Sequence, residues 1–221
     1  MRVIVFDLDG TLLDTGLDMM AAANRTFKAA GYQAQLSPSD RAIVVQGGRQ
    51  MFRALFEREG LEFTDTDLMA LYQKFVEDYR NNICVHTAFY PEAEQALLWC
   101  KENGYSVALC TNKPQVLTDA LIEALGIEKL FDHVVTPQTL GIAKPNAEPL
   151  LHAIKLAKAD VSNALMVGDT ITDVDAARNA QCPVLTVAFD QSVEAMEKLN
   201  PDMIIQSYSA FPSTVAEHFK T

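Results

Sequence analysis

The chain has 221 residues, of which 49% are hydrophobic and 21% are charged. This is ordinary globular composition, with material for one large domain or one and a half average ones. The formal net charge is −11, so we expect neither nucleic acid nor an anionic membrane surface as a partner. No apolar run approaches the roughly 20 residues of a membrane span, and the N-terminus reads as a strand rather than a signal peptide.

The four cysteines are far apart in the sequence, at Cys84, Cys100, Cys110 and Cys182, and form no C-x-x-C pair. This spacing argues against a zinc knuckle or a redox motif. Buried, reduced thiols are the better interpretation. We therefore expect a cytoplasmic protein, and we expect it to be a monomer or a homodimer.

The apolar run Val3-Ile4-Val5-Phe6 predicts a short strand covered on both faces, as in a parallel sheet. Side chains alternate along a strand, so Asp7 and Asp9 project to the same side, and Gly10 then lets the backbone turn. Two carboxylates at such a place repel each other unless a cation or a shared proton relieves them. An ordinary acidic turn after a strand explains this stretch equally well.

Residues 16 to about 84 carry helical patterns throughout. Apolar residues recur at helical spacing up to Gly31, and Ser37-Pro38 is a typical helix start with serine as the N-cap. The pair Gly47-Gly48 predicts a break, after which one helix runs to Gly60 and another covers about 67–81. We expect this stretch to be an all-helical insertion after the first strand.

From Tyr90 onward, strands alternate with helices. Strands are predicted at 106–110, 133–135, 164–167, 184–187 and 203–205, and helices at 91–104, 114–125, 147–157, 173–180, 192–199 and after 209. This alternation predicts right-handed β-α-β units and hence an α/β fold with a doubly wound, Rossmann-like parallel sheet. We expect residues 1–14 and 85–221 to form that core and residues 15–84 to form the helical domain.

Charge divides unevenly between the two predicted parts. Residues 15–84 hold 8 basic and 9 acidic side chains, whereas the rest of the chain holds 10 basic and 20 acidic ones. Six of the eight cations in 15–84 are arginines. An acidic core cannot attract an anionic substrate unaided, but a metal ion and the nearly neutral insertion could.

Polar residues that suit one chemical task follow several of the predicted strands. Thr111-Asn112 stands just before a helix N-terminus, which is a phosphate site, and Asp169 and Asp173 follow another strand. Taken singly, these residues fit an N-cap and an acidic turn, and Lys144 fits a solvated lysine. Ends of parallel strands share one edge, however, and together the groups match Mg²⁺-assisted phosphoryl transfer. The metal would offset the repulsion among the aspartates.

Four motifs in this order, Asp-x-Asp-Gly-Thr-Leu, strand-Thr-Asn, Lys-Pro and Gly-Asp-x-x-x-Asp, resemble those of the haloacid dehalogenase superfamily of phosphohydrolases. The helical insertion resembles the small α-helical cap domain of that superfamily. The stretches VFDLDGTLLDT, CTNKP and MVGDTITDVDAARNAQCPV look most like phosphoglycolate phosphatases and their near relatives. The resemblance covers the whole chain and implies a phosphatase that acts on a small phosphorylated metabolite.

The resemblance implies a role for each motif aspartate. Asp7 is the nucleophile that becomes an aspartyl phosphate, and Asp9 protonates the leaving oxygen and later deprotonates the attacking water. Mg²⁺ is held by the Asp7 carboxylate, the Asp9 backbone carbonyl and Asp169. Asp173 ligates through water or orients the other ligands.

Further residues are implied to bind the substrate. Thr111, Asn112 and Lys144 bind the transferring phosphoryl oxygens, and Lys144 also offsets charge near Asp7. This agrees with a separate physical argument, because a carboxylate can attack a phosphodianion only if cations screen their repulsion. We expect the insertion to set the substrate, with the loop 46–49 as the candidate contact and Arg49 as its charged group.

Other activities remain as alternatives. A sugar-phosphate mutase would use a proton-handling histidine on the first insertion helix, which has none, and a dehalogenase does not need Asp9. A phosphonate-cleaving enzyme would use an early lysine in the insertion, whose only lysines are Lys28 and Lys74. A catalytically silent regulatory module that binds a phospho-ligand would be expected to lose Asp7 or Lys144, and both are present.

Overall fold

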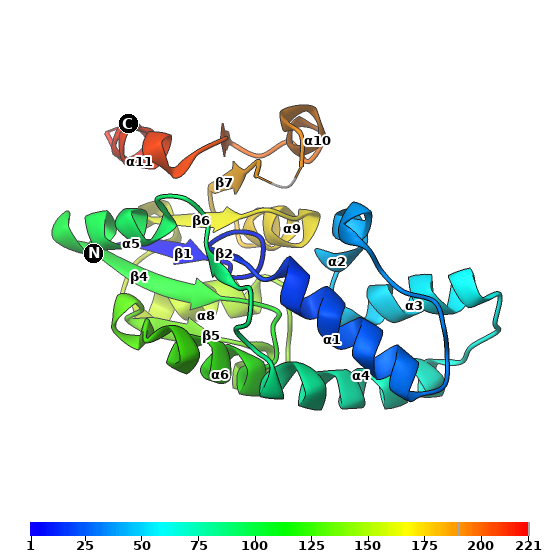
Figure 1. Ribbon diagram of the computed structural model, residues 1–221. Coiled ribbons are helices and arrows are strands. Elements are labelled where there is room, and N and C mark those ends of the chain that lie inside the picture. Colours follow the sequence, from blue (N-terminus) through cyan, green and yellow to red (C-terminus); the bar gives the residue numbers. More distant parts are fainter. Residues whose placement is uncertain (190, 221) are drawn as a thin grey trace.

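The computed structural model describes residues 1–189 and 191–220, so residues 190 and 221 of the predicted core lie outside the described residues. Its main feature is a six-stranded sheet with the order β5-β4-β1-β6-β7-β8, in which every pairing is parallel. The strands are β1 (Arg2–Phe6), β4 (Tyr105–Cys110), β5 (His133–Val135), β6 (Ala164–Gly168), β7 (Val184–Val187) and β8 (Met203–Ile205). Figure 1 shows β1, β4 and β6 pointing toward the helices at the other end of the molecule.

Strand β1 lies between β4 and β6 inside the sheet. Its apolar residues pack against a layer of helices on each face of the sheet. Ile4 and Phe6 belong to the hydrophobic cluster that includes α5 (Ala93–Glu102) and α11 (Phe211–His218). Val3 and Val5 belong to the cluster that includes α8 (Glu148–Leu156) and α9 (Ile171–Asn179). The core is completed by α6 (Gln115–Leu125), α7 (Pro137–Leu140) and α10 (Val193–Glu197). The doubly wound α/β fold expected from the sequence is confirmed.

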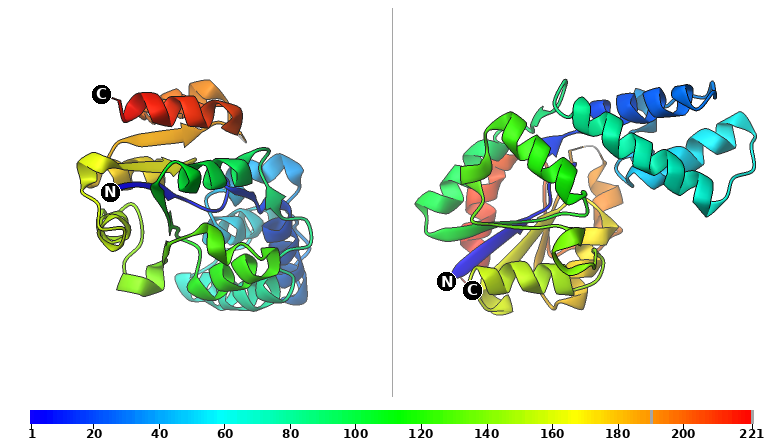
Figure 2. Two further views of the ribbon diagram at one scale, coloured as in Figure 1. Left: turned by 90° about the vertical axis from the view of Figure 1, so that its left-hand side faces the viewer. Right: turned by 90° about the horizontal axis from the view of Figure 1, so that it is seen from below.

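Four helices between residues 16 and 81 pack mainly on one another, and we call them the helical insertion. They are α1 (Gly16–Ala29), α2 (Arg41–Val44), α3 (Gly48–Glu59) and α4 (Asp65–Asn81). Phe27 and Phe52 anchor its interior, with aromatic contacts to Phe56 at 5.2 Å and Phe75 at 5.9 Å between ring centroids. Figure 2 shows the insertion beside the sheet edge, with α1 and α4 side by side.

A short antiparallel pair joins the insertion to the core. Strands β2 (Leu13–Asp14) and β3 (Ala88–Phe89) pair with Leu13 opposite Phe89. Beside them, the buried carboxylate of Asp18 accepts hydrogen bonds of 2.9–3.0 Å from the main-chain N–H groups of residues 85–87. The hydroxyl of Thr87 donates to the same carboxylate at 2.7 Å. One side chain at the start of α1 thus fixes the returning chain.

Most element bounds agree with the sequence prediction within two or three residues, and the differences have local causes. The predicted helix at Ser37-Pro38 is a 3₁₀ turn (Pro38–Asp40) that leads into the short α2, and a helix does begin at Gly48. Helix α9 starts earlier than predicted, since Thr170 and Asp173 form a capping box. The division into two domains stays a prediction.

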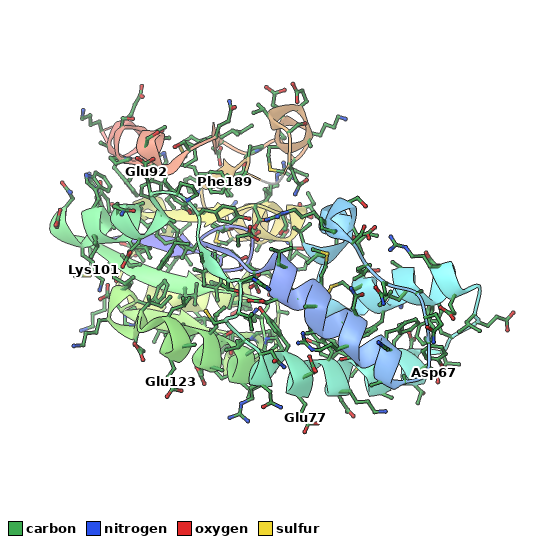
Figure 3. The ribbon with its side chains drawn as sticks, viewed as in Figure 1. Asp67, Glu77, Glu92, Lys101, Glu123 and Phe189 are labelled. Atoms are coloured by element: carbon green, nitrogen blue, oxygen red, sulfur yellow. The ribbon has the colours of Figure 1, made fainter. Side chains whose placement is uncertain are left out.

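Acidic side chains lie on the solvent faces of helices α4 and α6. Figure 3 shows Asp67, Glu77 and Glu123 projecting outward from α4 and α6, consistent with their exposure. Within residues 1–189 and 191–220, no helix combines the length and the apolar character that crossing a membrane would require. The cytoplasmic location and the monomer or homodimer state stay predictions.

Candidate active site

The candidate site lies at the carboxyl ends of three neighbouring strands. Strands β4, β1 and β6 are adjacent in the sheet, and Thr111, Asp7 and Asp169 are the residues that directly follow them. The main-chain N–H of Asp7 still donates to Val167 at 2.9 Å, so its carboxylate starts from a fixed backbone position. After β1, the next core strands along the chain, β4 and β5, lie on one side of β1 in the strand order. The chain then crosses over, and β6 lies on the other side of β1. Ligands bind at such switch points in open α/β sheets.

Three buried carboxylates meet at this edge. Asp7, Asp169 and Asp173 each offer an oxygen that lies within 4.8 Å of the other two. Burial raises the pKa of Asp7 to about 6 and the pKa of Asp169 well above its usual range, and the charge of Asp173 adds to both shifts. The protein therefore holds at least two carboxylates in an environment that disfavours their charge.

Two glycines allow the backbone to approach these carboxylates. A Cβ on Gly10 would lie 2.4 Å from Oδ2 of Asp169, and a Cβ on Gly168 would lie 2.4 Å from the Cβ of Asp173. Gly10 also has a φ of +85°, a conformation that favours glycine. Both positions are adjacent to a motif aspartate in the sequence, so the glycines belong to the geometry of the site.

Lys144 is buried among the acidic groups. Its ammonium donates to Oδ1 of Asp7 at 2.7 Å, to Oδ1 of Asp173 at 2.6 Å and to the carbonyl of Cys110 at 2.6 Å. Burial opposes the charged form, but the charges of Asp173 and Asp7 outweigh it and raise the pKa of Lys144 above its ordinary value. A permanent cation therefore lies next to the predicted nucleophile.

The two residues after β4 differ in what they can offer a ligand. Thr111 is buried, and its hydroxyl oxygen accepts a 3.2 Å hydrogen bond from the N–H of Lys113. Asn112 uses its side-chain amide for the main chain of Lys144, donating to its carbonyl at 2.8 Å and accepting from its N–H at 2.9 Å. Asn112 thus fixes the loop that carries Lys144, and its main-chain N–H is what it can offer to a phosphoryl oxygen.

The second motif carboxylate, of Asp9, faces the helical insertion. Thr15 donates to its Oδ1 at 2.7 Å, and the ammonium of Lys113 lies 2.9 and 3.2 Å from its two oxygens. Lys113 also donates to the hydroxyl of Tyr79 at 3.2 Å. The sequence motifs did not indicate Lys113 as a site residue. Its position directly after Thr111-Asn112, at a strand end, is the signal that could have identified it.

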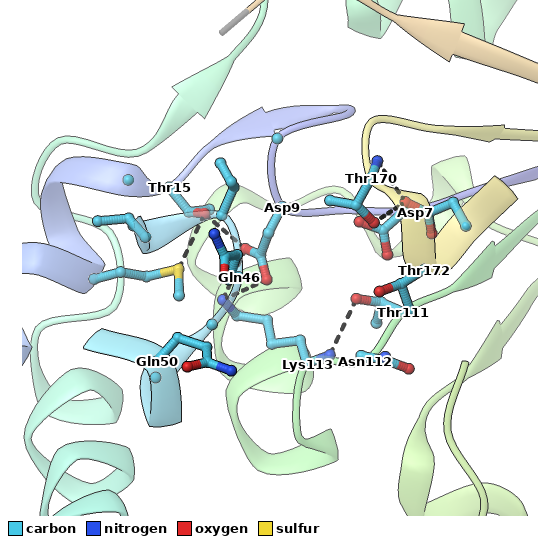
Figure 4. A pocket seen from close by; sticks show the side chains of 18 of the residues that line it. Asp7, Asp9, Thr15, Gln46, Gln50, Thr111, Asn112, Lys113, Thr170 and Thr172 are labelled. Carbon is cyan, nitrogen blue, oxygen red and sulfur yellow. Dashed lines mark hydrogen bonds and ion pairs between the residues drawn. The ribbon is translucent and has the colours of Figure 1, made fainter. Parts of the chain in front are cut away.

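A cavity of about 600 Å³ extends from these residues to the helical insertion. In Figure 4, Asp7, Thr111 and Thr172 lie on one side of the cavity, and Gln46 and Gln50 of the insertion lie on the other. The cavity is thus lined by both parts of the chain, and the insertion contributes polar side chains to it.

The role predicted for Arg49 stays a prediction, although the lining of the cavity does not favour it. Arg49 is exposed, its guanidinium carbon lies 5.6 Å from the centroid of the Tyr72 ring, and it is not among the described residues that line the cavity. Arg41 lines the cavity instead, and its guanidinium forms a 2.6 Å ion pair with Asp14 at the junction. Helix α3 begins at Gly48, so Arg49 lies in its first turn and is exposed, which the glycine pair alone could not reveal.

The donor atoms fit the predicted Mg²⁺. The ligand set is made of carboxylate oxygens, which this hard cation prefers, and a cation would offset both the burial and the charge of Asp173 that raise the pKa of Asp7. Thr11 donates to Oδ1 of Asp169 at 2.8 Å, and within the described part of the chain no hydrogen bond reaches its Oδ2. Both oxygens of Asp173 accept hydrogen bonds, from Lys144 and from Thr170, which suits an orienting role.

Comparison with known proteins connects this geometry to a family. Residues 4–187 match the family model described as haloacid dehalogenase-like hydrolase. The chain belongs to this family. The match runs from β1 through β7 and includes the helical insertion, so the membership expected from the four motifs is confirmed.

Curated relatives cover nearly the full chain. Phosphoglycolate phosphatase of Agrobacterium fabrum is 34% identical over 96% of this chain and 91% of its own length, and that of Mesorhizobium japonicum is 34% identical over 97% and 95%. Among solved structures, a protein from Haemophilus somnus described as a predicted phosphoglycolate phosphatase has a TM-score of 0.85 at 24% identity, with 97% of each chain covered. This haloacid dehalogenase-like hydrolase therefore shares its fold with that solved structure and matches the two curated relatives over nearly its full length.

Proposed function

We propose that this haloacid dehalogenase-like hydrolase is a Mg²⁺-dependent phosphatase that cleaves a small phosphate monoester, phosphoglycolate or a close analogue, through an aspartyl phosphate. The chain is a phosphoric monoester hydrolase. The family match and the curated relatives named phosphatases support a phosphatase. The arrangement around Asp7 is the observation that supports the proposed aspartyl phosphate. A carboxylate at the end of the central strand lies 2.7 Å from a buried ammonium and beside two further carboxylates.

The first step uses Asp7 and Asp9. A carboxylate oxygen of Asp7 attacks phosphorus and forms the acyl phosphate bond while the bond from phosphorus to the ester oxygen breaks. Asp9 gives its proton to the departing oxygen, which leaves as an alcohol. In the second step, Asp9 takes a proton from water, the hydroxyl attacks the phosphorus, and the acyl phosphate bond breaks to release inorganic phosphate and regenerate Asp7.

The phosphoryl oxygens are held by groups that the loops position. The ammonium of Lys144, the hydroxyl of Thr111 and the main-chain N–H of Asn112 are the donors we assign to them. Bound Mg²⁺ supplies further positive charge that offsets repulsion between the anionic nucleophile and the phosphodianion. Asp7, Asp169 and the carbonyl of Asp9 are the groups we expect to hold it, with Asp173 orienting them.

The helical insertion has the position of a cap. It covers the sheet edge where the predicted nucleophile lies, and it lines the cavity together with the core. Such a cover excludes bulk water from the acyl phosphate and limits the size of the substrate. A cavity of about 600 Å³ that includes Arg41, Gln46 and Gln50 suits a small polar monoester, and an arginine suits an acidic group on it.

The test is turnover of phosphoglycolate and of p-nitrophenyl phosphate by the full chain with Mg²⁺ and with excess chelator. We expect Mg²⁺-dependent release of phosphate, and we expect Asp7→Asn to abolish it with an unchanged circular dichroism spectrum. Asp119→Asn, at an exposed position on α6, is the matched control and should keep full activity. Turnover by Asp7→Asn at a near-normal rate, or full activity in chelator, would contradict the proposed function.

A further inference from the structure

The most unusual group outside the proposed chemistry is the ammonium of Lys113. This side chain is only 2% exposed, and it joins three separate elements. It comes from the loop after β4, pairs with Asp9 in the loop after β1, and donates to Tyr79 on α4 of the helical insertion. Its ammonium also lies 4.6 Å from the centroid of the Tyr79 ring. A single cation therefore connects the insertion to the predicted acid.

Stability alone is a weak reason for this arrangement. Burying an ammonium costs several kcal/mol, and a buried ion pair is often no more stabilising than apolar residues of the same size. The partner carboxylate is itself a quarter exposed, so it does not need Lys113 for solvation. Tyr79 has no exposed surface and places its hydroxyl on this ammonium, although a phenylalanine would fill the same space.

The contacts of Asp9 fix the direction of its carboxylate. Thr15, at the N-terminal end of the insertion, donates to Oδ1, and Lys113 contacts both oxygens. Figure 4 shows Asp9 directed toward Lys113 and away from Asp7. Two of the groups that define this orientation, Thr15 directly and Tyr79 through Lys113, belong to the helical insertion. The position of the insertion therefore sets the orientation of Asp9.

We propose that Lys113 is a positioning residue that couples the placement of helix α4 over the cavity to the orientation of Asp9 for proton transfer. With α4 in place, Tyr79 holds the ammonium and the ammonium holds the carboxylate of Asp9 in one orientation beside the cavity. With α4 displaced, Lys113 loses the Tyr79 hydroxyl and Asp9 loses a fixed partner. The inference rests on the proposed function, because it assigns the proton transfer to Asp9.

The leaving-group dependence of kcat/KM distinguishes a positioning role of Lys113 from the two other roles it could have. A positioning role for the acid affects departure of the leaving group, so the loss in kcat/KM grows as the leaving group becomes poorer. A purely structural role, or a contact with the phosphoryl group, lowers kcat/KM equally for all leaving groups. The ratio of two kcat/KM values separates these roles, because kcat/KM covers only the steps up to that departure and not the later hydrolysis of the acyl phosphate.

The experiment compares phenyl phosphate with p-nitrophenyl phosphate in the full chain with Mg²⁺. Both substrates lack a carboxylate and have similar sizes, whereas p-nitrophenolate leaves without needing a proton. We expect Lys113→Met to lower kcat/KM about tenfold or more on phenyl phosphate and less than about threefold on p-nitrophenyl phosphate. Tyr79→Phe, which keeps the ring, should change the ratio in the same direction by a smaller factor. Lys101→Met, which removes an exposed ion pair with Asp132, is the control and should leave the ratio unchanged.

The outcomes are decisive for each hypothesis. Equal losses on the two substrates, or no loss on either, would overturn the positioning role. If Lys113→Met does not fold, Tyr79→Phe decides, and an unchanged ratio in that variant overturns the inference. Wild-type protein that cleaves neither substrate with Mg²⁺ would contradict the proposed function itself. Activity in the wild type with an unchanged ratio in both variants contradicts only the role of Lys113.

Discussion

The raised pKa of Asp7 makes a quantitative prediction about the protein without metal. Its pKa in the folded chain is about 6, against 3.8 for an unperturbed aspartate, mainly because the carboxylate is buried. The folded state therefore holds the Asp7 proton more tightly than the unfolded state. As pH rises from about 4 to about 6, the unfolded chain releases this proton first, so stability falls over that window. A shift of about two pKa units corresponds to on the order of 3 kcal/mol.

Asp7→Asn removes this pH dependence, because the amide does not titrate. The assay is urea unfolding in excess chelator at about pH 4 and about pH 7.5 for the wild type and the variant. We expect the stability of Asp7→Asn relative to the wild type to increase by about 2–3 kcal/mol between the two pH values. Comparing the two proteins at each pH cancels the titrating groups that do not interact with Asp7, and Asp119→Asn should show no such change.

The result that refutes the reasoning is a stability difference that changes by less than about 1 kcal/mol between the two pH values. The folded protein would then not disfavour the charged form of Asp7. A metal ion would not be needed to stabilise that charge. Added Mg²⁺ provides a second check, because it should stabilise the wild type at pH 7.5 much more than Asp7→Asn.

Three further predictions concern other parts of the site and its support. Asp18→Asn replaces a buried acceptor with an amide that cannot accept at both of its ends, so we expect a loss of about 3 kcal/mol in urea unfolding, and a loss under about 1 kcal/mol contradicts the role of this carboxylate. Gly10→Ala should reduce Mg²⁺-dependent turnover at least about tenfold, because the new Cβ would meet the carboxylate of Asp169. Gly31 also has a positive φ but lies in open space, so Gly31→Ala should retain turnover, and equal effects of the two variants would contradict the steric argument. Arg41→Ala should lower kcat/KM for phosphoglycolate about tenfold and Arg49→Ala less than about twofold, and the reverse order would restore Arg49 as the contact.

The part of the site that could be predicted from sequence depends on strand ends. Asp7, Thr111 and Asp169 each follow an apolar run, and parallel strands bring the ends of such runs to one edge. Lys144 was found by motif order, and the structure places its ammonium 2.7 Å from Asp7. The catalytic roles of these residues stay predictions until activity is measured.

The parts that could not be predicted depend on side-chain direction and on contacts between distant segments. The amide of Asn112 turns to the main chain of Lys144, 32 residues away, and no local pattern indicates this. Asp18 likewise finds its partners 67–69 residues later in the chain. The guanidinium of Arg49 lies over the ring of Tyr72, 23 residues later in the chain. Strands β2 and β3 have two residues each, too short for an alternating pattern to be recognised.

The antiparallel pair of β2 and β3 has a consequence for how such a chain can diversify. Because Asp14 lies opposite Ala88, the two ends of the helical insertion are neighbours, and in topological terms the whole insertion is one long hairpin loop. The entropy of closing a loop grows only slowly with its length, so lengthening or replacing the insertion costs the sheet little. If the insertion sets the substrate, as we predict, substrate preference could change by exchange of one segment at this two-strand junction, while the predicted catalytic groups at the strand ends stay in place.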